Sequence, residues 1–501
     1  MQDNTNLRRQ FLHTALLATT ATVIVGCGGG GGSSGNLPSS SINPQPLPTG
    51  PLTLASATIS ASVYGSIGEG FAGLSYEKSQ LYGPLFSGTN TNLISLFKQL
   101  GPSVLRIGGN TVDKNVWTPA GAGQTPGQIA PSDITSLAAF VKATGWQCLY
   151  GINLGGSALG VTTPALAAEE VAYAAQLLGN SLLGVEIGNE CDLYGNAGNY
   201  YAGNWTLTDF EVLWQQYRSA ILAATPTVAI TGPASASNES NWTVPFGQYA
   251  TSNDITMLTQ HYYRANGASI SSTAQYLVTP DPTLISNLAK LEAVSSSIGV
   301  PFRIAECNSY YNGGASGVSD SYASALWVID YLFNCAQGGA CGVNFHGGGN
   351  GTGYTPIANI GAAVVGVRPE YYGIFLFTLA GPGSLLQTQL NAGSLNVTAY
   401  AVKSSSGRIN LVVINKDPSQ NLQLTVALPQ NFITASVLEM SQQTSGMSGP
   451  TLTASSGVTI QGATINADGS FSPSSGYTAS VNGKSMSCYV PALSAVLVQT
   501  N

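Results

Sequence analysis

The feature that most constrains this chain is a regular alternation of short apolar strands with longer helical patterns between residues 70 and 385. The candidate strands are 71–76, 103–107, 147–153, 182–188, 228–232, 255–262, 302–306 and 342–346. Helical spacing separates them, as in 208–224, where Leu213, Tyr217 and Ile221 fall on one face. Eight strand–helix units in a row are typical of a closed parallel barrel. We therefore predict an α/β fold with a (β/α)8 TIM barrel over residues 67–385.

A different pattern begins near residue 386. Short strands follow one another between Ser-, Gly- and Asn-rich turns, at 397–402, 409–414, 422–428, 435–440, 458–460 and 494–499. No helix-length period is present there, which predicts a β-sandwich over residues 386–501. Residues 52–66 also alternate, so we expect this stretch to add a strand to the sandwich and to connect the two domains.

The N-terminus has the pattern of an export signal. Arg8 and Arg9 precede an apolar run that ends at Cys27, which indicates a twin-arginine and lipoprotein signal over residues 1–27. The alternative is an ordinary secretory signal with a coincidental cysteine. Residues 28–51 are rich in Gly, Ser and Pro and are expected to form a flexible linker. The chain is thus expected to be exported to a bacterial cell envelope or the medium, with lipidated Cys27 as its one membrane contact.

Composition excludes several classes of partner. Only 8% of residues are charged and the net charge is −7, which argues against nucleic acid and against densely sulfated glycans as partners. Besides Cys27 there are six cysteines, whose spacing fits no zinc pattern, and histidines are few. We therefore expect no metal and no cofactor. Cys335 and Cys341 are close enough in sequence for a disulfide, but the sequence does not decide whether one forms.

Two glutamates stand at the ends of apolar strands. Glu190 follows Asn189 after the fourth candidate strand, and Glu306 ends the seventh. Active sites of such barrels lie at the C-terminal ends of the strands. A pair of carboxylates there matches what hydrolysis of a glycosidic bond requires, because one protonates the leaving oxygen and the other attacks the sugar. The alternative is that both glutamates merely cap their strands.

This arrangement resembles the clan of retaining glycosidases that carry the acid/base after an Asn on strand four and the nucleophile on strand seven. The resemblance implies that Glu190 is the acid/base and Glu306 the nucleophile, roughly 5–5.5 Å apart. It further implies that Arg106 orients Glu306, that Asn189 binds a sugar hydroxyl, and that Tyr262 contacts the nucleophile. Arg106 also has a competing role, which is to pair with buried Glu186; the two roles are compatible.

Within the clan the chain is most similar to glycoside hydrolase family 79, which includes bacterial β-glucuronidases and heparanases. The matching strings are residues 71–77, 106–110 with Asp113, 187–190 and 305–314. The resemblance implies that Tyr311, Gly313 and Tyr354 hold the carboxylate of a uronic acid. It also implies that Glu77 and Asp113 bind sugar hydroxyls. Asp113 is equally consistent with a turn residue, and the glycine-rich run from Gly313 with a plain loop.

The sequence thus predicts a retaining exo-β-glucuronidase that acts on neutral or plant-type glycans. A carbohydrate that carries glucuronic acid would be its substrate. The first alternative is a retaining exo-β-glycosidase for neutral sugars, such as a glucosidase or xylosidase. The second is a lipid-anchored protein that binds glycans without cleaving them. One departure from the clan is the absence of a Trp at the end of strand eight, where Phe345 and His346 stand.

Overall fold

A computed structural model describes residues 43–501 except 252–253, 352 and 444–448. The predicted signal, the lipidation residue Cys27 and most of the linker lie outside the described residues. No helix in the described part of the chain has both the length and the apolar character needed to cross a lipid bilayer.

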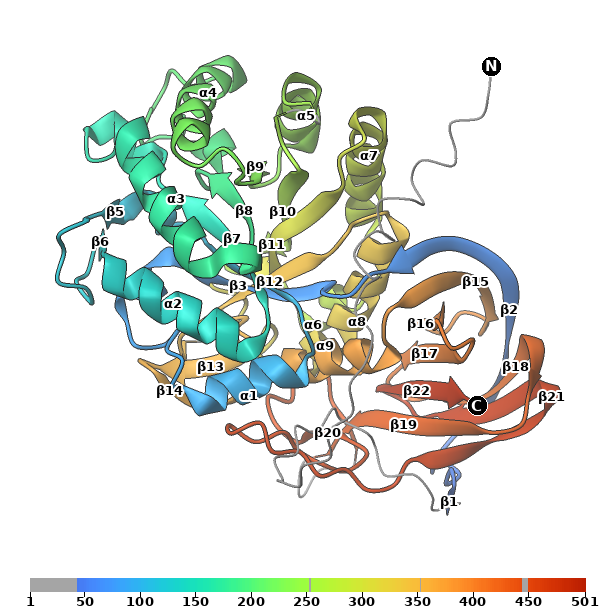
Figure 1. The fold of residues 1–501 in the computed structure, drawn as a ribbon. Coiled ribbons are helices and arrows are strands. Elements are labelled where there is room, and N and C mark those ends of the chain that lie inside the picture. Colours follow the sequence, from blue (N-terminus) through green and yellow to red (C-terminus); the bar gives the residue numbers. More distant parts are fainter. Residues whose placement is uncertain (1–42, 252–253, 352, 444–448) are drawn as a thin grey trace, which may run out of the picture. The chain divides into compact units, whose positions relative to one another are not determined.

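Eight parallel strands close into a barrel, which confirms the predicted fold class (Figure 1). Its strands are β3 (Ala72–Glu77), β4 (Val104–Gly108), β7 (Gln147–Ile152), β8 (Leu182–Ile187), β9 (Ile230–Ser235), β10 (Met257–Asn266), β11 (Phe302–Tyr311) and β12 (Val343–Gly347). Their residues are almost all buried, as expected for parallel strands that are covered by helices on the outside and by side chains within.

Helices cover the outside of the barrel, and local signals set where several of them begin. They are α1 (Thr91–Gln99), α2 (Pro131–Thr144), α3 (Pro164–Leu178), α4 (Leu207–Ala224), α5 (Val244–Tyr249), α6 (Ala274–Leu277), α7 (Pro282–Ile298), α8 (Tyr322–Gln337) and α9 (Pro369–Ala380). Thr206 caps α4 by accepting from the backbone N–H of Asp209, whose carboxylate accepts from Thr206 in return. Pro131, Pro164 and Pro282 occupy first-turn positions that need no N–H donor.

Strands β10 and β11 extend further than the sequence predicts. They continue past Tyr262 and Glu306 and pair up to Asn266 and Tyr311. Both neighbours of β10 carry one extra residue in their pairing with it: Ala234 of β9, opposite the step from Thr259 to Gln260, and Ala305 of β11, opposite the step from Gln260 to His261. A bulge of this kind changes which side chains face inward, because strand side chains alternate with a period of two.

The second domain is a ring of β-strands. The order is β1-β21-β18-β2-β15-β16-β17-β22-β19-β20, and β19 also pairs with β21. The strands are β1 (Asn43–Pro44), β2 (Leu52–Ile67), β15 (Gly383–Asn391), β16 (Val397–Lys403), β17 (Ile409–Asn415), β18 (Asn421–Phe432), β19 (Ala435–Gln442), β20 (Val458–Ile460), β21 (Tyr477–Val490) and β22 (Ser494–Thr500). Alternate residues such as Leu422, Leu424 and Val426 are buried between the two layers of the sandwich. Strand β2 lies between β15 and β18, so the segment before the barrel is a central strand of this domain.

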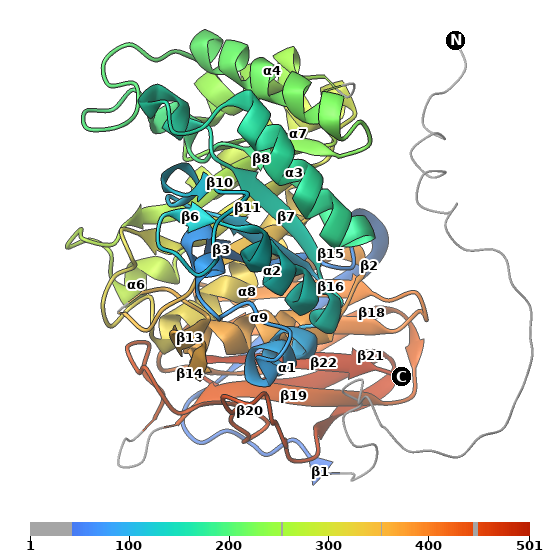
Figure 2. The ribbon, with the colours of Figure 1, turned by 60° about the vertical axis from the view of Figure 1, so that its left-hand side comes forward.

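The sandwich packs against α8 and α9 of the barrel, as Figures 1 and 2 both show. Tyr322 of α8 donates its hydroxyl to the carbonyl oxygen of Leu493 at 2.9 Å. Lys416 forms a buried ion pair with Asp330 of α8, and the ring of Tyr400 stacks on Phe333 at 4.4 Å. The two domains therefore share one hydrophobic core.

The six cysteines of the described residues are all free thiols, so Cys335 and Cys341 do not form the disulfide that their spacing left open. Five of the thiols are buried.

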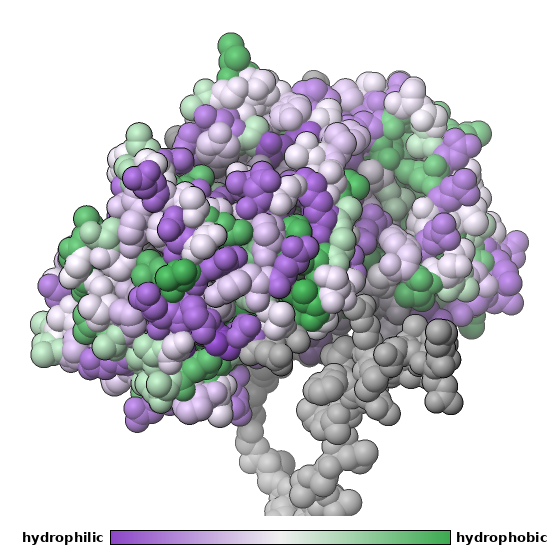
Figure 3. All heavy atoms as spheres, turned by 90° about the horizontal axis from the view of Figure 1, so that it is seen from above, coloured by the Kyte–Doolittle hydropathy of each residue, from purple (hydrophilic) through white to green (hydrophobic). Residues whose placement is uncertain are grey.

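The surface seen from above Figure 1 mixes hydrophilic and hydrophobic residues in small patches (Figure 3).

Candidate active site

Glu306 lies on β11 with its carboxylate buried at the catalytic end of the barrel. Its Oε2 accepts from Arg106 Nη1 at 2.8 Å, and its Oε1 accepts from the hydroxyl of Tyr263 at 2.8 Å. His346 Nδ1 lies 3.7 Å from Oε2. Burial alone would raise the pKa of Glu306, but the positive charges of His346, His261 and Arg106 and the Tyr263 hydrogen bond outweigh it and hold that pKa well below the ordinary range.

Glu190 stands three residues beyond the end of β8, in a turn rather than on the strand itself. It adopts a left-handed conformation, with φ at 50° and ψ at 46°, which is uncommon for a residue with a side chain. Its backbone N–H donates to the carbonyl oxygen of Ala234 at 2.8 Å, and its Oε1 lies 3.1 Å from His261 Nδ1. The turn therefore holds the carboxylate beside His261, where it is partly exposed.

The two predicted catalytic carboxylates lie close together. One oxygen of Glu190, one oxygen of Glu306 and one ring nitrogen of His261 all lie within 4.8 Å of one another. Three such groups are also the kind that bind a metal ion. Arg106 lies against two of them, with Nη1 on Glu306 and Nη2 at 3.1 Å from His261 Nε2. Its positive charge disfavours a second cation at that place.

Arg106 of β4 connects most of the site. Besides Glu306, it donates from Nε to Glu186 Oε2 at 2.6 Å and from Nη2 to Asn189 Oδ1 at 2.9 Å, and it is fully buried. Both roles considered from the sequence, orienting Glu306 and pairing with Glu186, therefore occur together. Gly108 makes room for the guanidinium, because a Cβ added there would lie 2.3 Å from Arg106 Cζ.

Tyr262 does not contact Glu306, so the predicted contact is wrong. Its hydroxyl donates to Asp281 on the helix side of the barrel, and it is Tyr263 that donates to Glu306. Strand β10 itself has no extra residue, so its side chains alternate: His261 and Tyr263 face inward and Tyr262 faces the helix side. Both tyrosines follow His261 in the sequence. The predicted strand ended at Tyr262, so it did not include Tyr263.

Glu77 and His346 form the opposite wall of the site. Glu77 accepts from the backbone N–H of Thr111 at 2.7 Å and from its hydroxyl at 2.6 Å, and its Oε1 lies 3.5 Å from His346 Nε2. Burial would raise the pKa of Glu77, but the bonds to His346 and Thr111 lower it overall. Burial would lower the pKa of His346, but Glu306 and Glu77 raise it overall. His346 is a site residue to which the sequence assigned no role.

A cavity of about 350 Å³ opens beside His346 and includes several of the predicted sugar ligands. Glu77, Gly313 and Tyr354 line it together with His346. The ring of Tyr354 lies 5.7 Å from that of Tyr263. Tyr311 is not among the lining residues; it is 44% exposed and meets Tyr263 edge-on at 6.5 Å. The structure thus brings Gly313 and Tyr354 together and leaves Tyr311 at the margin of the site.

Asp113 is a buried residue whose carboxylate bonds neighbouring loops, and it is not among the residues that line the cavity beside His346. It is only 4% exposed. Its Oδ1 accepts from the backbone N–H groups of Leu154 and Gly155 at 2.8 and 2.9 Å, and its Oδ2 accepts from the hydroxyl of Tyr194 at 2.5 Å. Both oxygens are thereby used to shape the loop after β7 and the segment after Glu190.

The side-chain amide of Asn189 is held so that its Nδ2 can donate a hydrogen bond. Its Oδ1 accepts from Arg106, and its Nδ2 has no partner among the residues that the structure describes. The side chain is 4% exposed. An amide held in this way presents a hydrogen-bond donor next to Glu190, as the role of binding a sugar hydroxyl requires.

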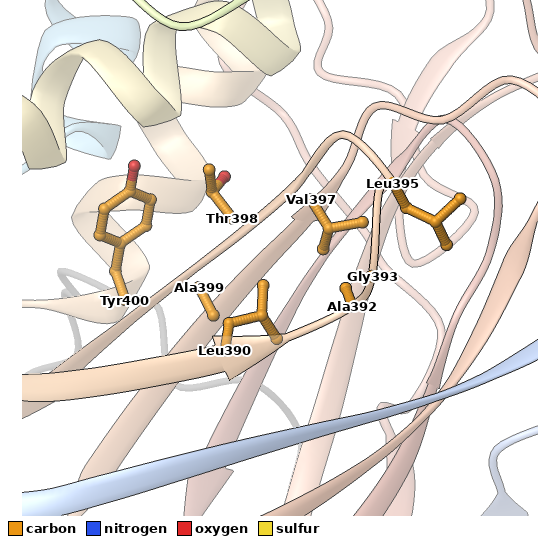
Figure 4. A pocket seen from close by; sticks show the side chains of 8 residues that line it. All are labelled: Leu390, Ala392, Gly393, Leu395, Val397, Thr398, Ala399 and Tyr400. Carbon is orange, nitrogen blue, oxygen red and sulfur yellow. The ribbon is translucent and has the colours of Figure 1, made fainter.

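Another cavity, of about 250 Å³, lies in the sandwich (Figure 4). Leu390, Leu395 and Val397 line it, and no side chain around it is acidic or basic. Thr398 and Tyr400 face away from these leucines toward Asp330, to which both donate. This cavity offers no acid, base or nucleophile for a reaction.

Comparisons with known proteins agree with this picture in part. No family model matches the chain. A β-glucuronidase from Aspergillus niger is 26% identical over 352 residues, 62% of this chain and 63% of that protein. A β-glucuronidase from Neurospora crassa is 31% identical over 130 residues, 23% of each chain. The matched part therefore spans less than two thirds of either relative.

Solved structures of glycoside hydrolases share the fold. A 4-O-α-L-rhamnosyl-β-D-glucuronidase from Fusarium oxysporum 12S has a TM-score of 0.73 and 19% identity, over 88% of this chain and 99% of that one. A family 51 arabinofuranosidase from Xanthomonas axonopodis pv. citri has a TM-score of 0.63 and 17% identity, over 89% and 100%. The chain thus has the barrel and sandwich of these hydrolases, and part of its sequence is similar to that of fungal β-glucuronidases.

Proposed function

We propose that this protein is a retaining exo-β-glucuronidase that releases terminal β-D-glucuronic acid by double displacement. The observation that carries the proposal is the pair Glu190 and Glu306, with nearest atoms within 4.8 Å, beside a cavity lined by Gly313 and Tyr354. No cofactor is needed for this reaction, because the two carboxyl groups supply the proton and the nucleophile.

The reaction starts with the attack of Glu306 on the anomeric carbon while Glu190 gives its proton to the leaving oxygen. Arg106 and Tyr263 donate to Glu306 and keep it ionised for the attack. The product is a covalent glycosyl-enzyme and the free aglycone. Glu190, now a base, takes a proton from water, which attacks the anomeric carbon and frees Glu306.

The short separation of the two carboxylates supports retention of configuration. An inverting enzyme needs roughly 6.5–9.5 Å between its carboxyl groups, because a water molecule must fit between the base and the sugar. Here the nearest atoms of Glu190 and Glu306 lie within 4.8 Å. Glu306 is therefore better placed to act as the nucleophile than as a base for water.

The cavity beside His346 supports the choice of a uronic acid. The Tyr354 hydroxyl and the Gly313 backbone N–H are neutral donors, which can replace water around a carboxylate. Glu306 and Glu77 raise the pKa of His346 despite its burial, which favours its positively charged form on the same side. The partial similarity to β-glucuronidases of Aspergillus niger and Neurospora crassa points the same way.

A second candidate is a retaining exo-β-glycosidase for neutral sugars. The position of Tyr311 favours it, because this tyrosine lies outside the cavity lining and is half-exposed. A glycan-binding protein without activity is the third candidate. The hydrogen bonds from Arg106 and Tyr263 to Glu306 argue against it, since binding alone does not require an ionised buried carboxylate.

A panel of aryl β-glycosides tests the substrate: glucuronide, glucoside, galactoside and xyloside. We expect a clear preference for the glucuronide, with the β-configured sugar released first. Glu306→Gln should lower kcat by about 10⁴-fold or more, because it removes the nucleophile. Glu190→Gln should lower it by about 10²–10⁴-fold, because it removes general acid catalysis. A preference for the glucoside would support the second candidate, and glycan binding without turnover would support the third.

We also propose that the chain is exported by the twin-arginine route and anchored by a lipid on Cys27. The proposal rests on the sequence pattern of residues 1–27. Cys27→Ser should move the protein from the membrane fraction to the soluble fraction without changing its activity. Equal partition of both forms would contradict the anchor.

A further inference from the structure

Asn308 is a fully buried residue of β11 whose side chain contacts three separate parts of the barrel. The two hydrogens on its Nδ2 are shared among three acceptors: the carbonyl oxygen of Tyr354 at 2.9 Å, that of His346 at 3.0 Å and Glu370 Oε2 at 3.2 Å. Its Oδ1 accepts from the backbone N–H of Ser309 at 2.6 Å, which fixes the orientation of the amide. One side chain thus joins the end of β12, the loop after it and α9.

Asn308 lies between Glu306 and the loop that contains Gly313. It lies two residues after Glu306 and three before Tyr311, on the strand that leads from the nucleophile to the loop with Gly313. The loop after β12 carries Tyr354. Asn308 therefore couples the strand of the nucleophile to the two loops that line the cavity.

The two loops also touch each other through glycine backbone. A Cβ on Gly314 would lie 3.2 Å from the backbone N of Tyr354, and a Cβ on Gly353 would lie 3.1 Å from the carbonyl oxygen of Gly313. Neither loop can shift by much without moving the other. The position of the loop that carries Tyr354 therefore determines the positions of both the Tyr354 hydroxyl and the Gly313 N–H.

Glu370, in the first turn of α9, is the third group that Asn308 contacts. It is fully buried, and its Oε1 has no partner among the described residues. Burial raises the pKa of Glu370 well above its ordinary value, which favours the protonated form of the group. In either form its Oε2 can accept from Asn308 Nδ2, which lies 3.2 Å away.

We propose that Asn308 is a positioning residue that determines the preference for a uronic acid, by holding the carbonyl groups of His346 and Tyr354 with the support of Glu370. In this arrangement the Tyr354 hydroxyl and the Gly313 N–H reach the same carboxylate. The inference rests on the proposed glucuronidase function and adds the residue that sets its specificity. Asn308 itself touches no reacting atom.

The test compares three variants by their kinetics on an aryl β-glucuronide. Asn308→Ala should raise KM by about 10-fold to 100-fold, because small displacements of binding groups have effects of this size. Its kcat should change by less than about 3-fold, since a carboxylate is bound equally in the ground state and the transition state. Glu370→Leu should raise KM in the same direction, and Glu370→Gln, which still offers an acceptor, should keep the KM of the wild type.

Asn344→Ala is the matched control. Asn344 is also a fully buried asparagine, and its Nδ2 donates to the carbonyl oxygens of Leu74 and Val104 at 3.0 and 2.8 Å, away from the cavity. This variant should melt at a lower temperature than the wild type and keep its KM. An equal rise of KM in Asn344→Ala and Asn308→Ala would overturn the inference, because the effect would then be a general loss of packing.

The remaining outcomes separate this inference from the proposed function. If the wild type cleaves the glucuronide but folded Asn308→Ala and Glu370→Leu keep its KM, the inference alone is wrong. If the wild type cleaves no glucuronide, the proposed function is wrong and the inference falls with it. Should Asn308→Ala fail to fold, Glu370→Leu and Glu370→Gln decide, because they leave the amide in place.

Discussion

At the scale of single residues, the guanidinium of Arg106 organises the candidate centre. It contacts Glu186, Glu306, Asn189 and His261 from one buried position. A planar group with five donors can serve several acceptors at once, which a lysine could not do. The carboxylate of Glu306 is thereby kept ionised although it is buried.

Tyr263→Phe tests the second donor to Glu306. Loss of a hydrogen bond to a charged group costs about 1.5–3 kcal/mol, so kcat should fall by about 10-fold to 100-fold. The pKa of Glu306 should rise toward its ordinary value, because the Tyr263 hydrogen bond lowers it. Since Glu306 must be ionised to react, the acidic limb of the profile of kcat/KM against pH should move to higher pH.

Tyr262→Phe is the control for that experiment. Its hydroxyl bonds Asp281 on the other side of the strand. The variant should lower the melting temperature and leave the acidic limb in place. A shift of the limb in Tyr262→Phe but not in Tyr263→Phe would contradict the contacts that we describe.

These two tyrosines also illustrate what the sequence could predict. Glu190, Glu306 and Arg106 followed from residue type and from the ends of strands, because barrel sites always lie there. The choice between Tyr262 and Tyr263 depended on which of them stands opposite Glu306, and the extra residue Ala305 of β11 sets that register, which no local pattern encodes. The role of Asp113 likewise depended on a loop from another strand, since its partners are Leu154 and Gly155.

At the scale of elements, the last residue of β4 is a glycine, Gly108, because the guanidinium of Arg106 leaves no space there for a side chain. Gly108→Ala would place a methyl group 2.3 Å from Arg106 Cζ, so the guanidinium must move. Overpacking of this kind lowers the free energy of unfolding by about 1–3 kcal/mol. Activity should fall by about 100-fold, because a displacement of catalytic groups by 1 Å has effects of that order.

Gly68→Ala is a suitable comparison, because a Cβ there meets nothing within 4 Å. It should retain the activity and the melting temperature of the wild type. Measured kcat/KM and thermal unfolding would distinguish the two. Full activity in Gly108→Ala would show that Arg106 can be displaced without cost.

At the scale of the whole molecule, an ion pair with little exposure joins the barrel and the sandwich within a larger shared interface. Asp330 of α8 pairs with Lys416 and accepts from Thr398 and Tyr400. Both domains contribute to the same core, in which Phe333 and Tyr400 are stacked. We therefore expect them to unfold together rather than one after the other.

Lys416→Met should lower the free energy of unfolding by about 3–5 kcal/mol, because it leaves a largely buried carboxylate without its cation. Urea unfolding followed by fluorescence and by enzyme activity should give one shared transition at lower denaturant. Lys403→Met, at an exposed position of β16, should change stability by less than about 0.5 kcal/mol. Loss of the sandwich with an active barrel remaining would contradict the shared core.

The central position of β2 has a consequence for how the molecule is made. Its partner β15 is synthesised more than 300 residues later, and β18 later still. At about 5–20 residues per second, β2 leaves the ribosome tens of seconds before either neighbour exists. Strand β2 therefore stays without either neighbour while the barrel is made, and the ring that contains it can close only after the whole barrel has been translated.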